Sequence, residues 1–129
     1  MDPDRPRLSG LVFAGGGILS VEQIHRLHVP SDLVVLSACD TATGPYHRGE
    51  GVMGLTRGFF QSGVPRVVVT SWSVSDDATG ALMADFHRQW APGATDAGAA
   101  LREARLALRR SGGPQAHPYY WGPFVYWGP

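Results

Sequence analysis

The sequence predicts an α/β fold with a mostly parallel sheet, and two observations lead to this fold class. Residues 33–36 and 67–69 are short apolar runs rich in valine and leucine, which is the composition of strands buried on both faces. Segments with helical periodicity alternate with such runs along the chain, and this alternation is typical of layered α/β sheets. At 129 residues the chain has the length of one small domain or of part of a larger one.

The elements follow one another in an alternating order after a disordered lead-in at residues 1–7, where Pro3 and Pro6 disfavour regular structure. We expect, in order, a strand at 8–14, a helix at 19–27, a strand at 33–38, a helix at 51–62, a strand at 66–72, helices at 75–90 and 95–110, and a strand at 123–127.

The first two helices are predicted from their ends and their apolar sides. Ser20 is the expected N-cap of the first, and Gly63 is the expected stop of the second. Gly54 and Gly58 weaken the second helix, and we interpret them as sites of close helix–sheet approach. The side chains expected to face inward are Ile24 and Leu27 in the first helix, and Val52, Leu55, Phe59 and Phe60 in the second.

The last two helices are predicted from amphipathic stripes. Ser75 can cap the helix at 75–90, and the negative charges of Asp76 and Asp77 suit its positive end. The expected inner side chains are Ala78, Leu82 and Phe86 in this helix, and Ala97, Leu101, Ala104 and Leu108 in the next. The side chains of the last helix expected to face water are Arg102, Arg105 and Arg109.

Composition limits the function classes and the compartment. The formal net charge is zero, which points to neither nucleic acid nor a membrane surface as a partner. No apolar stretch approaches the ~20 residues of a membrane span, and the first residues do not resemble a signal peptide. The single cysteine excludes an internal disulfide, so we expect a cytoplasmic protein.

That single cysteine, Cys39, follows the apolar run 33–36 by three residues. The carboxyl ends of parallel strands are where open α/β sheets place their chemistry, so Cys39 is a candidate catalytic thiol. Free cysteine is also among the most buried residue types, and a core position is the alternative. Position alone leaves both interpretations open.

Other candidate sites have ordinary structural interpretations beside the functional ones. The glycines at 15–17 lack a phosphate-binding motif and are expected to form a turn between short strands. His25 and His28 have no third ligand nearby in sequence, and we expect neither a metal nor a cofactor. The aromatic residues at 117–124 are expected to pack the last strand onto the sheet.

Acidic residues lie at the ends of the two apolar strands. They could hold Mg²⁺ for phosphoryl chemistry, recognise a basic group, or serve as turn and helix-start residues. The chain contains no lysine to meet a phosphate, which argues against the first option, and sequence position does not separate the other two. These residues are Asp32, Asp40, Asp76 and Asp77.

Several segments in order resemble the C-terminal half of a CHAT domain, a caspase-like peptidase module often found beside TPR repeats in bacteria. The resemblance covers nearly all of residues 8–129, and part of the pattern, around WSVSDD, is shared with the separase protease domain. The matching segments are SGLVFA at 9–14, LVVLSACDT at 33–41, GEGVMGL at 49–55, VVVTSW at 67–72, WSVSDD at 72–77, AALREAR at 99–105 and HPYYW at 117–121.

The resemblance implies a three-layer caspase-like sandwich whose N-terminal strands lie outside this sequence. It also implies that Cys39 is the nucleophile of a cysteine peptidase, whose thiolate attacks a peptide carbonyl. A free thiol titrates at ~8.5 and needs a base, which in this family is a histidine followed by glycine. No histidine of this chain precedes a glycine, so we expect the 129 residues alone to have little or no peptidase activity.

The resemblance further implies a protein or peptide substrate, with Asp76 first and Asp40 second as contacts for a basic side chain. Expected partners are TPR-type or other regulatory domains, or a separate N-terminal half. The strand at 33–38 is expected to present an unpaired edge open to self-association. The alternative function is a non-catalytic interaction module, or a gene remnant, with the same fold.

Overall fold

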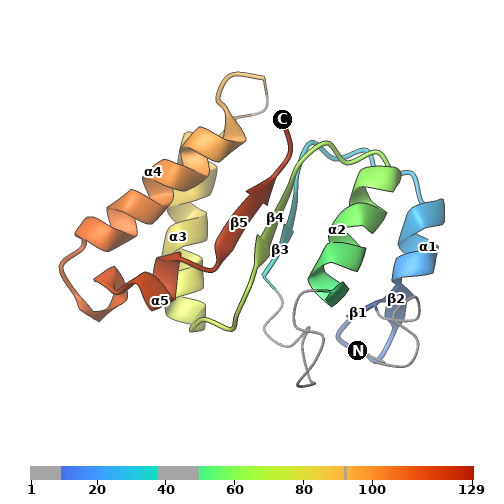
Figure 1. The fold of residues 1–129 in the computed structure, drawn as a ribbon, viewed down its shortest axis with the longest axis horizontal. Coiled ribbons are helices and arrows are strands. Elements are labelled where there is room, and N and C mark those ends of the chain that lie inside the picture. The colour runs from blue at the N-terminus through green and yellow to red at the C-terminus, as the bar shows by residue number, and fades with distance from the viewer. Residues whose placement is uncertain (1–9, 38–49, 92) are drawn as a thin grey trace.

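The computed structural model describes residues 10–37, 50–91 and 93–129, and it has the expected mixed α/β character. Its elements, labelled in Figure 1, are β1 (Gly10–Val12), β2 (Ile18–Ser20), α1 (Val21–Arg26), β3 (Val34–Leu36), α2 (Glu50–Gln61), β4 (Val67–Thr70), α3 (Asp76–Gln89), α4 (Ala97–Arg110), α5 (Pro118–Trp121) and β5 (Phe124–Trp127). A 3-10 turn, Pro114–Ala116, precedes α5.

The described strands form two small sheets. One is the antiparallel hairpin β1–β2, and Gly15 and Gly16 adopt positive φ angles in its turn, as expected for a turn between short strands. The other has the order β3-β4-β5. Its β3–β4 pair is parallel and its β4–β5 pair is antiparallel, so this sheet is mixed over the described strands.

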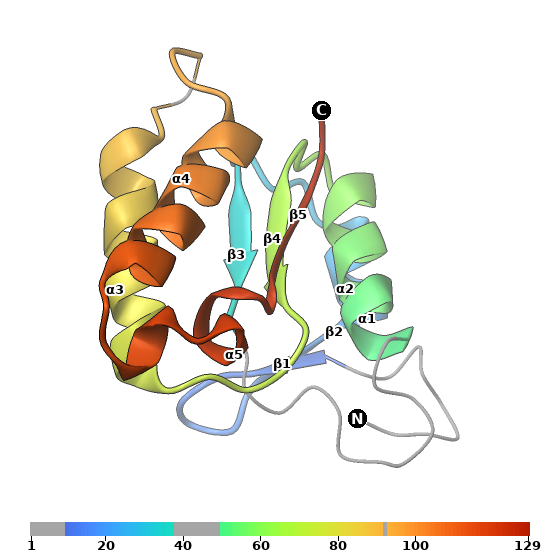
Figure 2. The ribbon, with the colours of Figure 1, turned by 60° about the vertical axis from the view of Figure 1, so that its left-hand side comes forward.

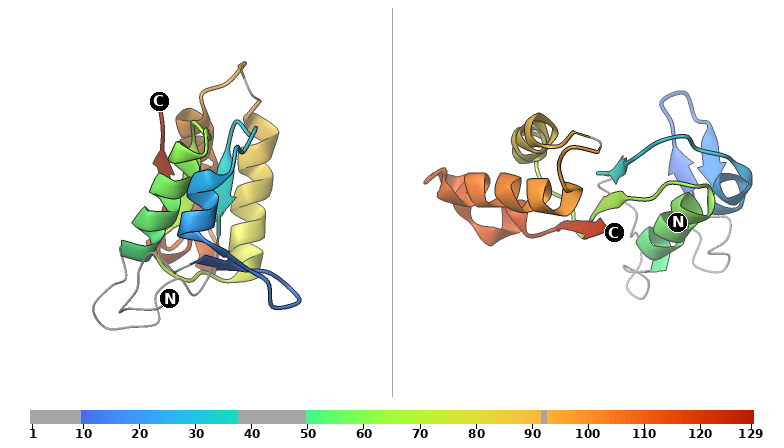
Figure 3. Two further views of the ribbon diagram at one scale, coloured as in Figure 1. Left: turned by 90° about the vertical axis from the view of Figure 1, so that its right-hand side faces the viewer. Right: turned by 90° about the horizontal axis from the view of Figure 1, so that it is seen from above.

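Helices lie on both faces of the three-stranded sheet (Figure 1 and Figure 2). Successive side chains of a strand point to opposite faces, and β4 divides its valines in this way. Val67 and Val69 join a cluster with α1 and α2, whereas Val68 joins a cluster with α3 and α4. The view from above in Figure 3 shows the helix pairs α1–α2 and α3–α4 on opposite sides of the sheet.

Ser20 is the N-cap of α1, as predicted, and forms a complete capping box with Gln23. Two predictions about this helix were wrong. Residues 18–20, in part assigned to the helix, form strand β2, because they pair with β1. Leu27 lies at the C-cap and is 45% exposed, since the helix ends one residue before it.

Helix α2 packs on the sheet and on α1. Gly63 follows it with φ +98°, which confirms the predicted stop. Phe59 is buried, but Phe60 is 37% exposed because it lies about 100° further round the helix. A Cβ atom at Gly58 would lie 3.2 Å from Ile24 Cγ2 and from a ring carbon of His25, so the close approach is between two helices, not between helix and sheet.

Helices α3 and α4 pack against each other and bury the predicted apolar stripes. The Ser75 side chain caps α3, and the Asp96 side chain caps α4 by accepting hydrogen bonds from Gly98 N and Ala99 N. One arginine departs from expectation. Arg105 is only partly exposed, because its guanidinium lies 5.8 Å from the centre of the Trp121 ring.

The C-terminal aromatic segment is helical before it becomes strand. Residues 118–121, for which we expected no helix, form α5, with Pro118 in its first turn and His117 as its cap. Phe124 is fully buried, and Tyr120 and Trp121 pack against the α3–α4 cluster, in agreement with a packing role. Within the parts of the chain described, no helix is both long enough and apolar enough to cross a membrane.

Candidate functional site

The candidate site lies at the edge where β3 and β4 both end. The two strands are parallel and Leu36 pairs with Val69, so their carboxyl ends emerge side by side. Thr70, the last residue of β4, is buried, and its hydroxyl donates a long hydrogen bond of 3.5 Å to the carbonyl of Leu36. Ser37, the next residue after β3, is exposed at this edge.

The loop after β4 is fixed at the same edge by the C-terminal segment. Trp72 Nε1 donates a hydrogen bond of 2.9 Å to the carbonyl of Tyr119, and the Tyr119 hydroxyl donates one of 2.8 Å to the carbonyl of Ser73. The Ser71 amide donates to the carbonyl of Pro123 at 2.9 Å, and Val74 is buried. Residues 71–74 are therefore held by contacts with Tyr119 of α5 and with Pro123, which precedes β5.

Helix α3 starts where this loop ends and presents its N-terminus beside the edge. The Ser75 hydroxyl accepts a hydrogen bond from Ala78 N at 3.4 Å. Asp76 and Asp77 occupy the first turn and are exposed, and no described residue forms an ion pair with the Asp76 carboxylate. A carboxylate at this position is favoured by the helix dipole.

A surface hollow of about 430 Å³ adjoins Ser75. It lies between the start of α3 and the turn after α4, and Asp76 is not one of its lining residues. Those residues are Ser75, Ser111, Gly113, Pro114, Gln115 and Tyr120.

Of the three site residues predicted from the sequence, the structure places Asp76. Cys39 and Asp40 lie outside the described residues. The structure therefore gives the edge from which the Cys39 segment departs and the position of Asp76 beside the neighbouring strand. The sequence analysis missed the contacts of Trp72 with Tyr119, which join segments 47 residues apart.

The described histidines have local structural contacts. His117 Nδ1 accepts a hydrogen bond from Tyr119 N at 3.2 Å, and the His87 ring lies 5.0 Å from that of Phe86. His25 lies against Gly58, and His28 lies against Gly63. Across residues 10–37, 50–91 and 93–129, no three acidic, histidine or cysteine side chains gather in a way that could hold a metal ion.

Comparison with known proteins gives one match. No curated protein and no solved structure matches the chain. The family model described as the CHAT domain matches residues 1–129, which is the whole sequence. The order of motifs around the parallel strands and this full-length match agree, and the chain belongs to the CHAT domain family, a group of caspase-like, peptidase-related domains.

Proposed function

We propose that this chain is the C-terminal part of a CHAT-type cysteine peptidase domain with a three-layer caspase-like sandwich, in which Cys39 is the nucleophile. The observation that carries the proposal is the parallel pairing of β3 with β4 in a member of this family. That pairing brings the segment leading to Cys39 and the loop leading to Asp76 out of the sheet at one edge. The proposal places the domain in the cytoplasm.

The position of Cys39 in the chain supports this role. Ser37 is exposed at the carboxyl edge, and Cys39 is two residues further along the chain. Consecutive Cα atoms are about 3.8 Å apart, so covalent geometry alone keeps the thiol-bearing residue near this edge. The thiolate would attack a peptide carbonyl, form an acyl-enzyme and release the amine, and water would then hydrolyse the thioester.

The 129 residues contain the proposed nucleophile but not the family's histidine–glycine pair. Without that pair, both the activation of the thiol and part of the oxyanion site are absent. We therefore propose that the base comes from chain outside these residues, from a preceding segment or a separate N-terminal half. The residues that follow the histidines are Arg26, Val29, Arg48, Arg88 and Pro118.

Asp76 is the proposed contact for a basic substrate side chain, with Asp40 as the second. Its support is the exposed carboxylate at the N-terminus of α3, beside the edge reached by the Cys39 segment. A helix-start role would place the same residue type at the same position, so only a measurement of substrate preference separates the two roles.

The first experiment measures peptide cleavage by the 129-residue chain, with Cys39→Ala as the matched control. We expect no cleavage above that of the variant, because the base is absent. A substantial rate that Cys39→Ala abolishes would show that these residues supply their own base.

The second experiment tests the site without requiring turnover. A peptide chloromethyl ketone that ends in Arg should alkylate Cys39 about two- to fivefold faster than one that ends in norleucine, since an exposed ion pair contributes at most about 1 kcal/mol. Asp76→Asn should remove the preference, and Asp77→Asn, one residue further along α3, should leave it. Equal rates for the two reagents would contradict a role for Asp76 in substrate binding.

The edge of β3 is a proposed site of association. Among the described strands β3 pairs only with β4, and its three residues are partly buried, whereas all four residues of β4 are buried. A partner strand, from a separate N-terminal half or from a second copy, would complete the hydrogen bonding of this edge. Sedimentation should show concentration-dependent association of the 129-residue chain, and a monomer at all concentrations would count against the proposal.

The rival function is a non-catalytic interaction module with the same fold, in which Cys39 is a core residue. The absence of a histidine–glycine pair from this sequence favours it. The reactivity of the Cys39 thiol in the native chain separates the two functions, because a core thiol is shielded from reagents.

A further inference from the structure

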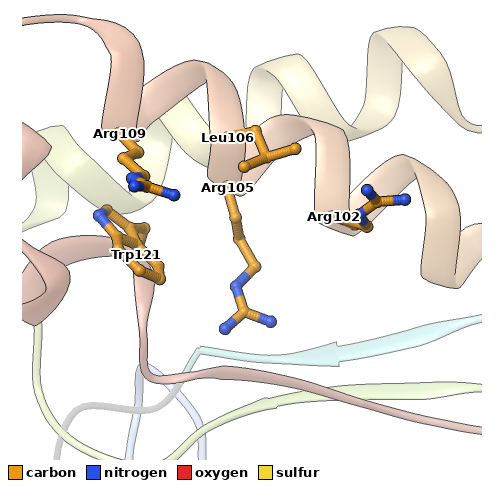
Figure 4. A pocket seen from close by; sticks show the side chains of 5 residues that line it. All are labelled: Arg102, Arg105, Leu106, Arg109 and Trp121. Carbon is orange, nitrogen blue, oxygen red and sulfur yellow. The ribbon is translucent and has the colours of Figure 1, made fainter.

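A basic pocket lies between α4 and Trp121 of α5 (Figure 4). Its volume is about 140 Å³, and it is lined by Arg102, Arg105, Leu106, Arg109 and Trp121. Figure 4 shows the three guanidinium groups extending from α4, with Arg105 between the other two and Arg109 beside the Trp121 ring. The pocket combines several cations with an apolar wall.

The three arginines repel one another on the helix. Arg102 and Arg105 are three residues apart, and Arg105 and Arg109 are four apart, which are the spacings at which like charges destabilise a helix. The ion pairs between described residues are Arg26–Glu22 and Arg88–Asp85, and neither involves the pocket. Within the described part of the chain, the pocket charges are therefore not neutralised.

Arg105 is held in place while one of its donors remains unused. Its guanidinium lies 5.8 Å from the centre of the Trp121 ring, and Trp121 is itself fixed by a hydrogen bond of 3.0 Å from its Nε1 to the carbonyl of Ala116. The Arg105 Nε atom is buried and has no hydrogen-bond partner among the described residues. A buried donor without an acceptor is rare in native structures and costs free energy, so this side chain has hydrogen-bonding capacity that the described residues do not use.

We propose that this pocket binds an acidic peptide segment of a protein partner, with an Asp or Glu carboxylate at Arg105. A guanidinium fork matches a carboxylate in two parallel hydrogen bonds, and flanking arginines add attraction. Leu106 and Trp121 offer an apolar wall for the neighbouring residue of the peptide. The interaction is independent of Cys39 and of the proposed peptidase activity.

The volume of the pocket and the net charge of the chain favour an acidic side chain of a protein as the occupant. The pocket is smaller than the ~300–1,000 Å³ of sites for drug-sized ligands, but it can admit one side chain. The chain as a whole is formally neutral, which disfavours nucleic acid, whose binding depends on extended positive surfaces.

The test uses the 129-residue chain and a short fluorescein-labelled peptide in which Glu alternates with Leu, with the Gln analogue as its control. Fluorescence anisotropy should show saturable binding at least about tenfold tighter for the Glu peptide. Arg105→Gln should weaken that binding by about tenfold, because it removes the central guanidinium. Arg110→Gln makes the same charge change on the same helix outside the pocket lining, and it should leave binding within about twofold.

A second variant and a second readout distinguish a specific loss of binding from misfolding of the variant. Arg102 and Arg109 are exposed, so Arg102→Gln/Arg109→Gln should retain the fold and still weaken binding. The indole N–H signal of Trp121, assigned with Trp121→Phe, should shift on titration with the Glu peptide. Equal binding of the Glu and Gln peptides, or equal weakening by Arg105→Gln and Arg110→Gln, would overturn the proposal. Displacement of the peptide by inorganic phosphate but not by an equal concentration of acetate would instead assign the pocket to phosphate groups.

Discussion

The two faces of the three-stranded sheet are covered in different ways. On one face, α3 and α4 are both 14 residues long, both have side-chain N-caps, and they enclose a cluster of nine buried residues. On the other face, α1 has only six residues, and the cluster with α2 has seven buried residues. The hairpin β1–β2 lies on the side of α1 and α2 (Figure 3).

Exposed apolar side chains are concentrated on the α1–α2 side. Of the nine large apolar side chains that are exposed among the described residues, six belong to the hairpin, α1, its C-cap or α2. They are Val12, Phe13, Ile18, Leu27, Met53 and Phe60. Two helices of 14 residues thus complete a core on one face, whereas the hairpin and the six-residue α1 on the other leave apolar surface in contact with water.

The largest expected difference between the faces comes from a matched pair of core truncations. Phe86 is fully buried in the α3–α4 cluster and stacks on Trp90 with ring centres 6.0 Å apart. Phe86→Ala should lower the free energy of unfolding by about 3–5 kcal/mol. Phe59→Ala, in the α1–α2 cluster, should cost less because that region can relax more easily around the cavity.

Urea unfolding of both variants measures this difference, with Phe60→Ala as the control for an exposed phenylalanine. A cost for Phe59→Ala equal to or above that for Phe86→Ala would contradict the view that the α3–α4 face is the better closed of the two.

A smaller effect on the free energy of unfolding is expected from the N-caps of α1 and α3, which lie on opposite faces of the sheet. Ser20→Ala removes the oxygen that accepts a hydrogen bond of 3.1 Å from Gln23 N, and it should cost about 1 kcal/mol. In a helix of six residues this loss should be local, so amide hydrogen exchange should accelerate in α1 before the rest of the chain. Ser75→Ala on α3 should cost less, because that contact is 3.4 Å and the helix is longer. Faster exchange throughout the chain in Ser20→Ala would argue against local dependence.

The smallest expected effect distinguishes two glycines of α2. A Cβ atom at Gly54 would meet nothing closer than Val21 Cγ2 at 4.0 Å, so Gly54→Ala should stabilise the protein by about 0.5–1 kcal/mol. At Gly58 the new methyl group would crowd Ile24 and His25 at 3.2 Å, which should cancel this gain or reverse it. Thermal unfolding of the two variants provides the comparison. Equal stabilisation by both would show that α1 does not pack tightly on α2.

Much of the fold could be predicted from the sequence where an element carries its own local signals. Helices α3 and α4 begin within one or two residues of their expected starts, because a capping side chain and an apolar stripe act within one segment. Elements β2 and α5 were missed, because segments of three and four residues take their conformation from pairing and tertiary contact. The errors at Leu27 and Phe60 arose because apolar residues near a helix end, or next to a buried neighbour, were assumed to face inward.

The candidate site was predictable only in part, for a related reason. Asp76 was identified as a helix-start residue, and the structure places it there. The contacts of Tyr119 with Trp72 and Ser73 join distant segments, and no local pattern reports them. The role of Cys39 is implied by family resemblance, because position alone favours a core residue and leaves the nucleophile as the alternative.

Alkylation of Cys39 by iodoacetamide is the most direct test of its proposed role as the nucleophile, because that role requires an accessible thiol. The rate should be measured by mass spectrometry for the native 129-residue chain and for the same chain unfolded in urea, at the same pH. We expect a native rate within about threefold of the unfolded rate, since thiol reactivity follows exposure and thiolate fraction. A native rate about 100-fold slower would identify a shielded core cysteine and contradict the assignment of Cys39 as the nucleophile.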